Sequence, residues 1–370
     1  MALRDVWEAV DKEKTVKTIG HRWVFDIKRH ADGLIEKFKA RRVARGDRQQ
    51  PGMDCTKTYA PTASLMSLRL ILAHAMCSGW TLLSFNVSGA YLYSPVKEIV
   101  FLEPPTYFCP ELKGKALRLK KALYSMRQAG RCWWLFLLDI LTRMVFAAME
   151  VNKSLYIFRN GKDTIAIWIH VDDGVAASNS PDAVSDFKCR LCAEVDIKLH
   201  NTICQIVGLE CAFGEGEVAI AQRHLTNSIL DAYPWPIVKT NCPLPVLPPP
   251  NVAVEGETLD ATPFHSDIGS LAYLVSRVRP DLAFVVNYLD QHSMAPTKAH
   301  WCIVGYLLST QHHRLVMQPG KLSLNLWSDT GWGGDLKRSQ TGFMLKLGHT
   351  PILWSSKRQG VVALSTWAAE

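Results

Sequence analysis

The sequence lacks a long apolar run and a signal peptide. Its most hydrophobic stretch, residues 133–149, is interrupted by Asp139 and Arg143 and is too short to cross a bilayer. We therefore expect this stretch to form a helix packed into a core. The first residues contain no apolar segment of the kind that directs secretion. From these two absences we expect that the protein neither spans a membrane nor binds one.

The sequence also lacks a regular arrangement of cysteines. Its ten cysteines are scattered without the spacing of a disulfide framework. Only Cys189 and Cys192 lie close together, and no second Cys or His pair follows at zinc-finger spacing. This distribution favours a reducing compartment, with buried or idle thiols.

The sequence also lacks the composition of a disordered or low-complexity protein. Hydrophobic residues make up 48% and charged residues 21% of the 370 residues, which is typical of globular proteins. The length allows two or three domains, each with its own core. Lys and Arg number 42 against 34 Asp and Glu, a net charge of +8. This excess suits a polyanionic partner without establishing one.

One change in composition divides the chain. Residues 242–250 read CPLPVLPPP, and prolines at this density can continue neither a helix nor a central strand. We place a linker at residues 241–262. Downstream, residues 267–289 and 298–308 have helical spacing. Alternating apolar residues then predict a three-stranded antiparallel meander over residues 322–326, 343–347 and 352–354.

Upstream of the linker the pattern mixes helix and strand. Residues 65–76 have helical spacing and residues 81–87 are typical of a strand. The clearest hairpin is residues 164–178, with Asp172 and Asp173 at its turn. Its apolar side chains fall on one face by period two, and they are Ile165, Ile167, Ile169 and Val171.

Two adjacent aspartates at a hairpin tip can hold metal ions rigidly beside a cleft. Magnesium prefers oxygen ligands, often one or two carboxylates together with substrate phosphates. Nucleotidyl transfer commonly uses two such ions about 4 Å apart. Taken alone, Asp172 and Asp173 are a weak signal, because most such pairs are simply solvated turns, so the pair needs context.

Context comes from ordered motifs along nearly the whole chain, which resembles the copia-type reverse transcriptase of LTR retrotransposons. The motifs are GHRWVFDIK at 20–28, KFKARRVARG at 37–46, YAP at 59–61, KALYSMRQAGRCW at 121–133, HVDD at 170–173, GLE at 208–210, GSLAY at 269–273, RPDLAF at 279–284, PTKAHW at 296–301, SD at 328–329 and WSSKRQ at 354–359.

The resemblance implies an α+β right-hand polymerase with fingers, palm and thumb over residues 1–240. A helical connection over 263–318 and a truncated RNase H-like sheet over 319–370 would follow the linker. The implied activity is RNA-directed DNA polymerisation from deoxynucleoside triphosphates, with an RNA template, a DNA primer and Mg²⁺ at a two-metal site. The family's expected location is the cytoplasm or a virus-like particle, and the oligomeric state is not indicated.

Residue roles also follow from the resemblance. Asp172 and Asp173 would hold the metals, Lys39 and Arg41 would bind the triphosphate, and the Tyr91 ring would exclude a 2′-hydroxyl. A solvated basic strand and a core tyrosine are the competing interpretations of Lys39, Arg41 and Tyr91.

Gln128 matches the glutamine of the family's nucleotide pocket. Ser125 and Gly130 replace the usual Gly and Pro around it, and Arg42 stands where the family usually has an apolar residue.

The pattern departs from the family at the first palm carboxylate, where Asn86 stands. Asparagine offers a carbonyl oxygen but no negative charge, so we expect impaired polymerisation. The alternative is a non-catalytic nucleic-acid-binding remnant of a degenerate or domesticated retroelement. Asp329 and Glu370 match the first two RNase H carboxylates, and the later ones are missing. We therefore expect no RNase H activity and an exposed apolar face on the meander.

Overall fold

The computed structural model describes most of the chain, namely residues 5–12, 17–29, 35–200, 203–214, 216–244, 261–294, 296, 301–332, 338–363 and 365–369. The chain divides into two compact units. Unit 1 comprises residues 1–63, 85–174 and 182–199, and unit 2 comprises residues 64–84, 175–181 and 200–370. Most of the predicted linker, residues 245–260, lies outside the described residues. The domain boundaries inferred from the sequence stay a prediction.

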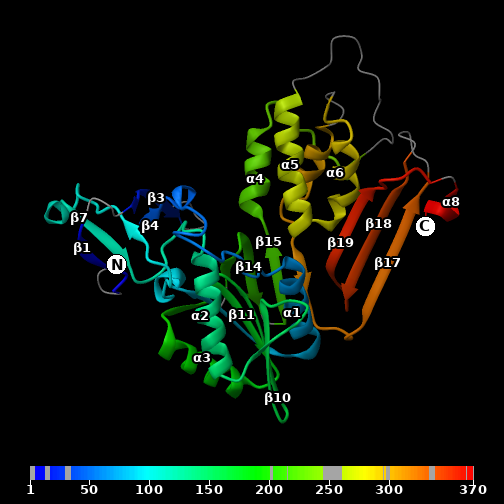
Figure 1. Ribbon diagram of the computed structural model, residues 1–370. Coiled ribbons are helices and arrows are strands. Elements are labelled where there is room, and N and C mark those ends of the chain that lie inside the picture. Colours follow the sequence, from blue (N-terminus) through cyan, green and yellow to red (C-terminus); the bar gives the residue numbers. More distant parts are fainter. Residues whose placement is uncertain are drawn as a thin grey trace. The chain divides into compact units, whose positions relative to one another are not determined.

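Unit 1 contains a four-stranded sheet and a separate two-stranded hairpin (Figure 1). The sheet has the order β1 (Trp7–Asp11), β7 (Lys115–Leu119), β6 (Phe101–Leu102) and β2 (Thr18–Ile19). Its core is apolar and includes Ile19, Leu102 and Leu117, each at most 2% exposed. The hairpin pairs β3 (His21–Arg29) with β4 (Ile35–Ala44) in antiparallel register. Short 3₁₀ turns lie at Gly46–Arg48 (η2) and Pro110–Leu112 (η4).

A six-stranded sheet carries the predicted aspartate pair. Its order is β12 (Ile197–His200), β5 (Thr81–Val87), β11 (Asp173–Ser178), β10 (Asp163–His170), β9 (Leu155–Asn160) and β8 (Ala147–Ala148). The predicted strand over residues 81–87 and the predicted hairpin are both confirmed. Alternation buries the β10 isoleucines, including Ile165 and Ile167, so one face of the hairpin packs into the core.

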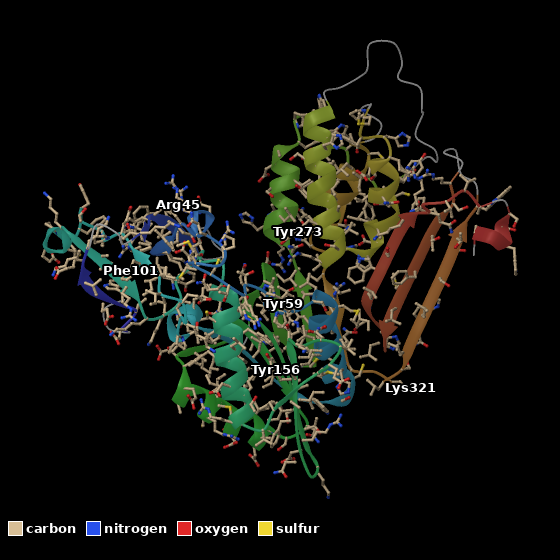
Figure 2. All side chains as sticks on the ribbon, viewed as in Figure 1. Arg45, Tyr59, Phe101, Tyr156, Tyr273 and Lys321 are labelled. Carbon is tan, nitrogen blue, oxygen red and sulfur yellow. The ribbon has the colours of Figure 1, made fainter. Side chains whose placement is uncertain are left out.

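Helices α2 (Ala129–Arg143) and α3 (Pro181–Glu194) accompany this sheet, and Arg143 and Glu194 form a 2.6 Å ion pair between them. Tyr156 on β9 is almost fully buried (Figure 2), and this burial raises the pKa of its hydroxyl to about 12. The helix predicted over 133–149 was too long at its C-terminal end. Val145 has a φ of 67°, and this left-handed residue ends the helix before β8 begins.

Unit 2 contains α1 (Leu65–Ser78), which confirms the helix predicted over residues 65–76. The Ser64 side chain caps it by accepting from the Ser67 backbone N–H, and Gly79 ends it in the left-handed conformation. A second four-stranded sheet has the order β13 (Ile203–Ile206), β14 (Leu209–Gly214), β15 (Glu217–Ala221) and β16 (Leu315–Met317). Helix α4 (Arg223–Ala232) follows β15.

The helix predicted over residues 267–289 is two helices. Helix α5 (Ala261–Arg277) ends before a 3₁₀ turn, η5 (Pro280–Leu282), and α6 (Ala283–Asp290) follows it. Pro280 lacks a backbone N–H and cannot continue α5, which explains the break. Helix α7 (Ile303–Ser309) covers residues 303–308 of the helix predicted over 298–308. Helix α5 includes residues 261 and 262, the last two positions of the predicted linker.

The predicted meander is confirmed as the sheet β17 (Leu324–Gly331), β18 (Gln340–Leu347) and β19 (Thr350–Arg358), which lie side by side in Figure 1. Helix α8 (Thr366–Ala369) follows. Within the described part of the chain, no helix combines the length and hydrophobicity that crossing a bilayer requires.

Candidate active site

The aspartate pair lies at the tip of the β10–β11 hairpin. Val171 and Asp172 form the turn, and Asp172 is exposed while Asp173 is partly buried. Val171 has a φ of 57°, a strained conformation for a β-branched residue. The Trp133 indole N–H on α2 donates to the Val171 carbonyl at 2.6 Å and so anchors the strained tip.

Asn86 on β5 meets this tip, although it is 87 residues away from Asp173 in sequence. Its side-chain Nδ2 donates to Asp173 Oδ1 at 2.9 Å. The next residue, Val87, donates its backbone N–H to the Asp172 carbonyl at 2.7 Å. The structure therefore brings Asn86 on β5 together with Asp173 on β11, beside the turn that holds Asp172.

Close packing explains why glycine follows the aspartates. A Cβ atom on Gly174 would lie 2.1 Å from Cζ of the Phe85 ring on β5. Phe85 in turn contacts Phe187 of α3, with ring centroids 6.1 Å apart. Because glycine has no side chain, β11 can approach β5 closely. This close approach places Asp173 within hydrogen-bonding distance of Asn86.

Tyr91 lies in the 3₁₀ turn η3 (Ala90–Tyr93), which directly follows β5. Burial and the nearby Asp172 charge raise the pKa of its hydroxyl, with a further contribution from Tyr124. The Tyr91 and Tyr124 rings contact edge to face with centroids 5.2 Å apart. The phenol therefore stays protonated at neutral pH beside the aspartate tip.

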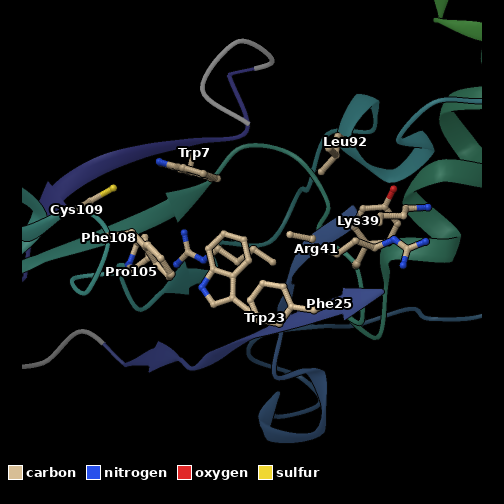
Figure 3. A pocket seen from close by; sticks show the side chains of 12 residues that line it. Trp7, Trp23, Phe25, Lys39, Arg41, Leu92, Pro105, Phe108 and Cys109 are labelled. Carbon is tan, nitrogen blue, oxygen red and sulfur yellow. The ribbon is translucent and has the colours of Figure 1, made fainter. Parts of the chain in front are cut away.

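Lys39 and Arg41 lie on β4 and, with Tyr124, border a cavity of about 700 Å³ (Figure 3). Tyr124 thus connects this cavity to Tyr91 and, through Tyr91, to the hairpin tip.

Gln128 is 1% exposed, and both ends of its amide bind within the chain. Its Oε1 accepts from Gln49 Nε2 at 2.9 Å, and its Nε2 donates to the Asp54 carbonyl at 2.8 Å. Gln49 also accepts the Arg127 backbone N–H at 2.8 Å. No local sequence signal indicated this network, because its members are 74 to 79 residues apart.

Asp329 lies on β17, where its side chain is exposed and Oδ1 accepts the Thr330 backbone N–H at 2.9 Å. Glu370 lies outside the described residues. Among the described residues, no three His, Cys, Asp or Glu side chains gather as a metal site. At the hairpin tip, two carboxylates stand beside the amide of Asn86, so the donors there are hard oxygens.

The chain is similar to known proteins over most of its length. A profile of the family "Reverse transcriptase (RNA-dependent DNA polymerase)" matches residues 4–246. The Pol polyprotein from transposon RE1 of Arabidopsis thaliana is 32% identical over 98% of this chain and 25% of its own length. The corresponding protein from transposon TNT 1-94 of Nicotiana tabacum is 26% identical over 100% of this chain and 30% of its length.

The Ty1-BL Gag-Pol polyprotein of Saccharomyces cerevisiae is also similar, at 26% identity over 96% of this chain and 21% of its length. The chain thus belongs to the reverse transcriptase family. Within that family, it corresponds to the reverse transcriptase region of copia-type Pol polyproteins, as the motifs predicted. It spans about a quarter of the length of these relatives.

Proposed function

We propose that this chain is an RNA-directed DNA polymerase with weakened catalysis, acting on a primed RNA template with deoxynucleoside triphosphates. The contact between Asn86 and Asp173 carries the proposal, because it brings position 86, where the resemblance implies a carboxylate, against the aspartate pair. The same proposal assigns fingers, palm and a thumb-like region to residues 1–240. It assigns a connection to 263–318 and an RNase H-like sheet to 319–370.

Asp172 and Asp173 would hold Mg²⁺, and the carbonyl oxygen of Asn86 could add a neutral ligand. These are hard oxygen donors of the kind that magnesium prefers. When bound, the metal would neutralise charge on the triphosphate and on the attacking 3′-oxygen. The Asn86 amide, by donating to Asp173, holds that carboxylate in place.

The other residues would bind and orient the nucleotide. Lys39 and Arg41 would attract the triphosphate, and the half-buried Tyr91 ring would close the space beside the sugar. Gln128 would act on the pocket through the positions of Gln49 and the turn at Asp54, since its amide is engaged with both.

Weak catalysis follows from the missing charge at position 86. A loss of about 4 kcal/mol of transition-state stabilisation lowers a rate roughly a thousandfold. We expect Asn86→Asp to raise the rate of primer extension by up to about a thousandfold. The rate would be measured with magnesium on a primed RNA template. Asn160→Asp, which adds the same charge at an exposed position on β9, should leave the rate unchanged.

Asp173→Asn, made in the Asn86→Asp background, should abolish the gain. Equal rates for the parent chain and Asn86→Asp would contradict the role of position 86. Salt-dependent binding of primer–template without extension by either form would instead support a non-catalytic nucleic-acid-binding protein.

A further inference from the structure

The turn that carries Asp172 is held by hydrogen bonds from two different elements. The Val171 carbonyl accepts from the Trp133 indole N–H of α2 at 2.6 Å. The Asp172 carbonyl accepts from the Val87 backbone N–H of β5 at 2.7 Å. Both carbonyl groups of the two-residue turn are therefore bound, one by a helix and the other by a strand. Only the bond from Trp133 comes from a side chain, so a substitution can remove it.

Val171 is the residue whose backbone needs this support. Its φ of 57° lies in the left-handed region, which is unfavourable for a β-branched residue. A strained residue persists only where its surroundings fix its conformation. With its carbonyl unbound, the turn would be free to relax, and the adjacent Asp172 would move with it. The hydrogen bond therefore bears on where the carboxylates lie.

Trp133 is itself fixed in place. It is 2% exposed, and its ring centroid lies 5.9 Å from that of Phe136, three residues further along α2. Phe136 stacks on Tyr93 of η3 with ring centroids 6.3 Å apart, and the Tyr93 hydroxyl accepts the Asp196 backbone N–H at 2.8 Å. The indole donor thus has little freedom to follow the turn. A functional site keeps its geometry when its supporting side chains are locked by packing in this way.

We propose that Trp133 is a positioning residue for the metal site: by binding the Val171 carbonyl, its indole N–H keeps the carboxylates of Asp172 and Asp173 in the arrangement that binds Mg²⁺. The inference rests on the proposed function, because it takes these aspartates as the metal ligands. The competing interpretation is a core tryptophan whose N–H only needs an acceptor. That interpretation predicts a loss of stability with no effect on the metal.

Metal binding can be measured without any turnover. Mn²⁺ takes the oxygen ligands that suit Mg²⁺, and the electron paramagnetic resonance signal of the free ion gives its dissociation constant. Trp133→Phe removes the N–H and retains an aromatic ring. We expect it to raise the dissociation constant of the 370-residue chain for Mn²⁺ about tenfold, the effect of losing one buried hydrogen bond. Asp172→Asn should nearly abolish the binding, which would assign the measured site to the aspartate pair.

Trp354→Phe is the matched control. Trp354 is 9% exposed, and its indole N–H donates to the Val275 carbonyl at 2.9 Å, so the substitution removes the same kind of bond within unit 2. It should lower the free energy of unfolding, as Trp133→Phe does, and leave the Mn²⁺ affinity unchanged.

Val171→Gly tests whether the bond acts through the turn. Glycine adopts the left-handed conformation without strain, so the turn no longer needs the indole to hold it there. When Val171→Gly is added to Trp133→Phe, most of the lost Mn²⁺ affinity should return.

Equal Mn²⁺ affinity in the parent chain and Trp133→Phe would overturn the positioning role and leave the proposed function intact. An equal loss of affinity in Trp133→Phe and Trp354→Phe would also overturn it, as would a loss that Val171→Gly does not recover. Mn²⁺ that binds the parent chain no more tightly than Asp172→Asn would instead overturn the metal site, and both proposals with it.

Discussion

Ser125 occupies a backbone position that suits glycine. Its φ is 66°, and a Cβ on the neighbouring Gly46 would lie 1.9 Å from the Ser125 carbonyl oxygen, so the two turns approach closely. A side chain in the left-handed region costs about 1 kcal/mol. This conformation explains the glycine that the family resemblance led us to expect there.

We expect Ser125→Gly to raise the free energy of unfolding by up to about 1 kcal/mol, because relief of strain exceeds the entropy that glycine adds to the unfolded chain. Urea titration would measure it. Ser125→Ala keeps a Cβ and should show no gain, and a gain in both variants would contradict the strain argument.

His21 links stability to pH. Burial, and then the charge of Arg42, lower its pKa below the ordinary value of 6.5. As pH falls through 6.5 the unfolded chain takes up a proton that folded His21 resists, so stability present above that pH is lost. Urea titrations at pH 7.5 and 5.5 should show this loss.

His21→Gln cannot titrate and should lose less stability over the same interval. His74, whose pKa burial also lowers, accounts for part of the remaining acid sensitivity. An identical pH dependence in the parent chain and His21→Gln would show that His21 makes no contribution.

For single residues, the sequence motifs could pick out important positions, but they could not show which other residues those positions contact. The family motifs singled out Gln128 and Arg42, yet nothing local showed that both are buried. The Gln128 partners are 74 to 79 residues away, and the Arg42 partner Glu103 is 61 residues away. Such contacts form only when separate elements pack together.

Among the elements, β11 and β5 depend on Gly174 for their close contact. In Gly174→Ala the added methyl group would collide with Phe85, whose ring is held by Phe187. Overpacking of this kind typically costs about 1–3 kcal/mol. We expect that loss in the free energy of unfolding, together with slower primer extension, because Asp173 precedes the glycine.

In a chain that already carries Phe85→Leu, Gly174→Ala should lower the free energy of unfolding much less than it does in the parent chain, since the collision is with the ring itself. Gly269→Ala provides the control: it lies in α5 with no atom within 4 Å of the new Cβ, so stability should be unchanged or higher. Additive losses at positions 85 and 174 would rule out the collision.

The element predictions succeeded where periodicity was strict. Alternation along residues 164–178 gave the hairpin and its turn, because one face is buried. Helix ends were less accurate. Pro280 could have indicated the end of α5, but the prediction followed the apolar spacing, which continues past it. The left-handed conformation of Val145 could not be predicted, because valine rarely adopts it.

For the whole chain, the decisive prediction was the convergence of Asn86 with the aspartate pair. No periodicity joins residues 87 positions apart, and the expectation came from family motifs alone. The packing of Gly174 against Phe85 and the bond from Trp133 to Val171 supply the physical reason. Neither could be distinguished in the sequence from ordinary core residues.

Strand β17 is an edge strand of its sheet, and several of its apolar side chains are exposed to solvent. Leu324 is 63% exposed and Leu326 64%, and both lie on one face by alternation. An unpaired edge beside an exposed apolar face favours association between copies. Burying one leucine contributes about 1.5–3 kcal/mol. We therefore expect the purified chain to self-associate as its concentration rises.

Leu326→Lys should weaken that association at least about tenfold, measured as the dissociation constant from sedimentation equilibrium. Asn325→Lys adds the same charge at the adjacent exposed position, which alternation places on the opposite face of β17. If both lysine variants weaken association equally, charge repulsion is responsible. If only Leu326→Lys does so, the leucine face itself forms the contact, because the two variants differ in the face that they alter and not in charge.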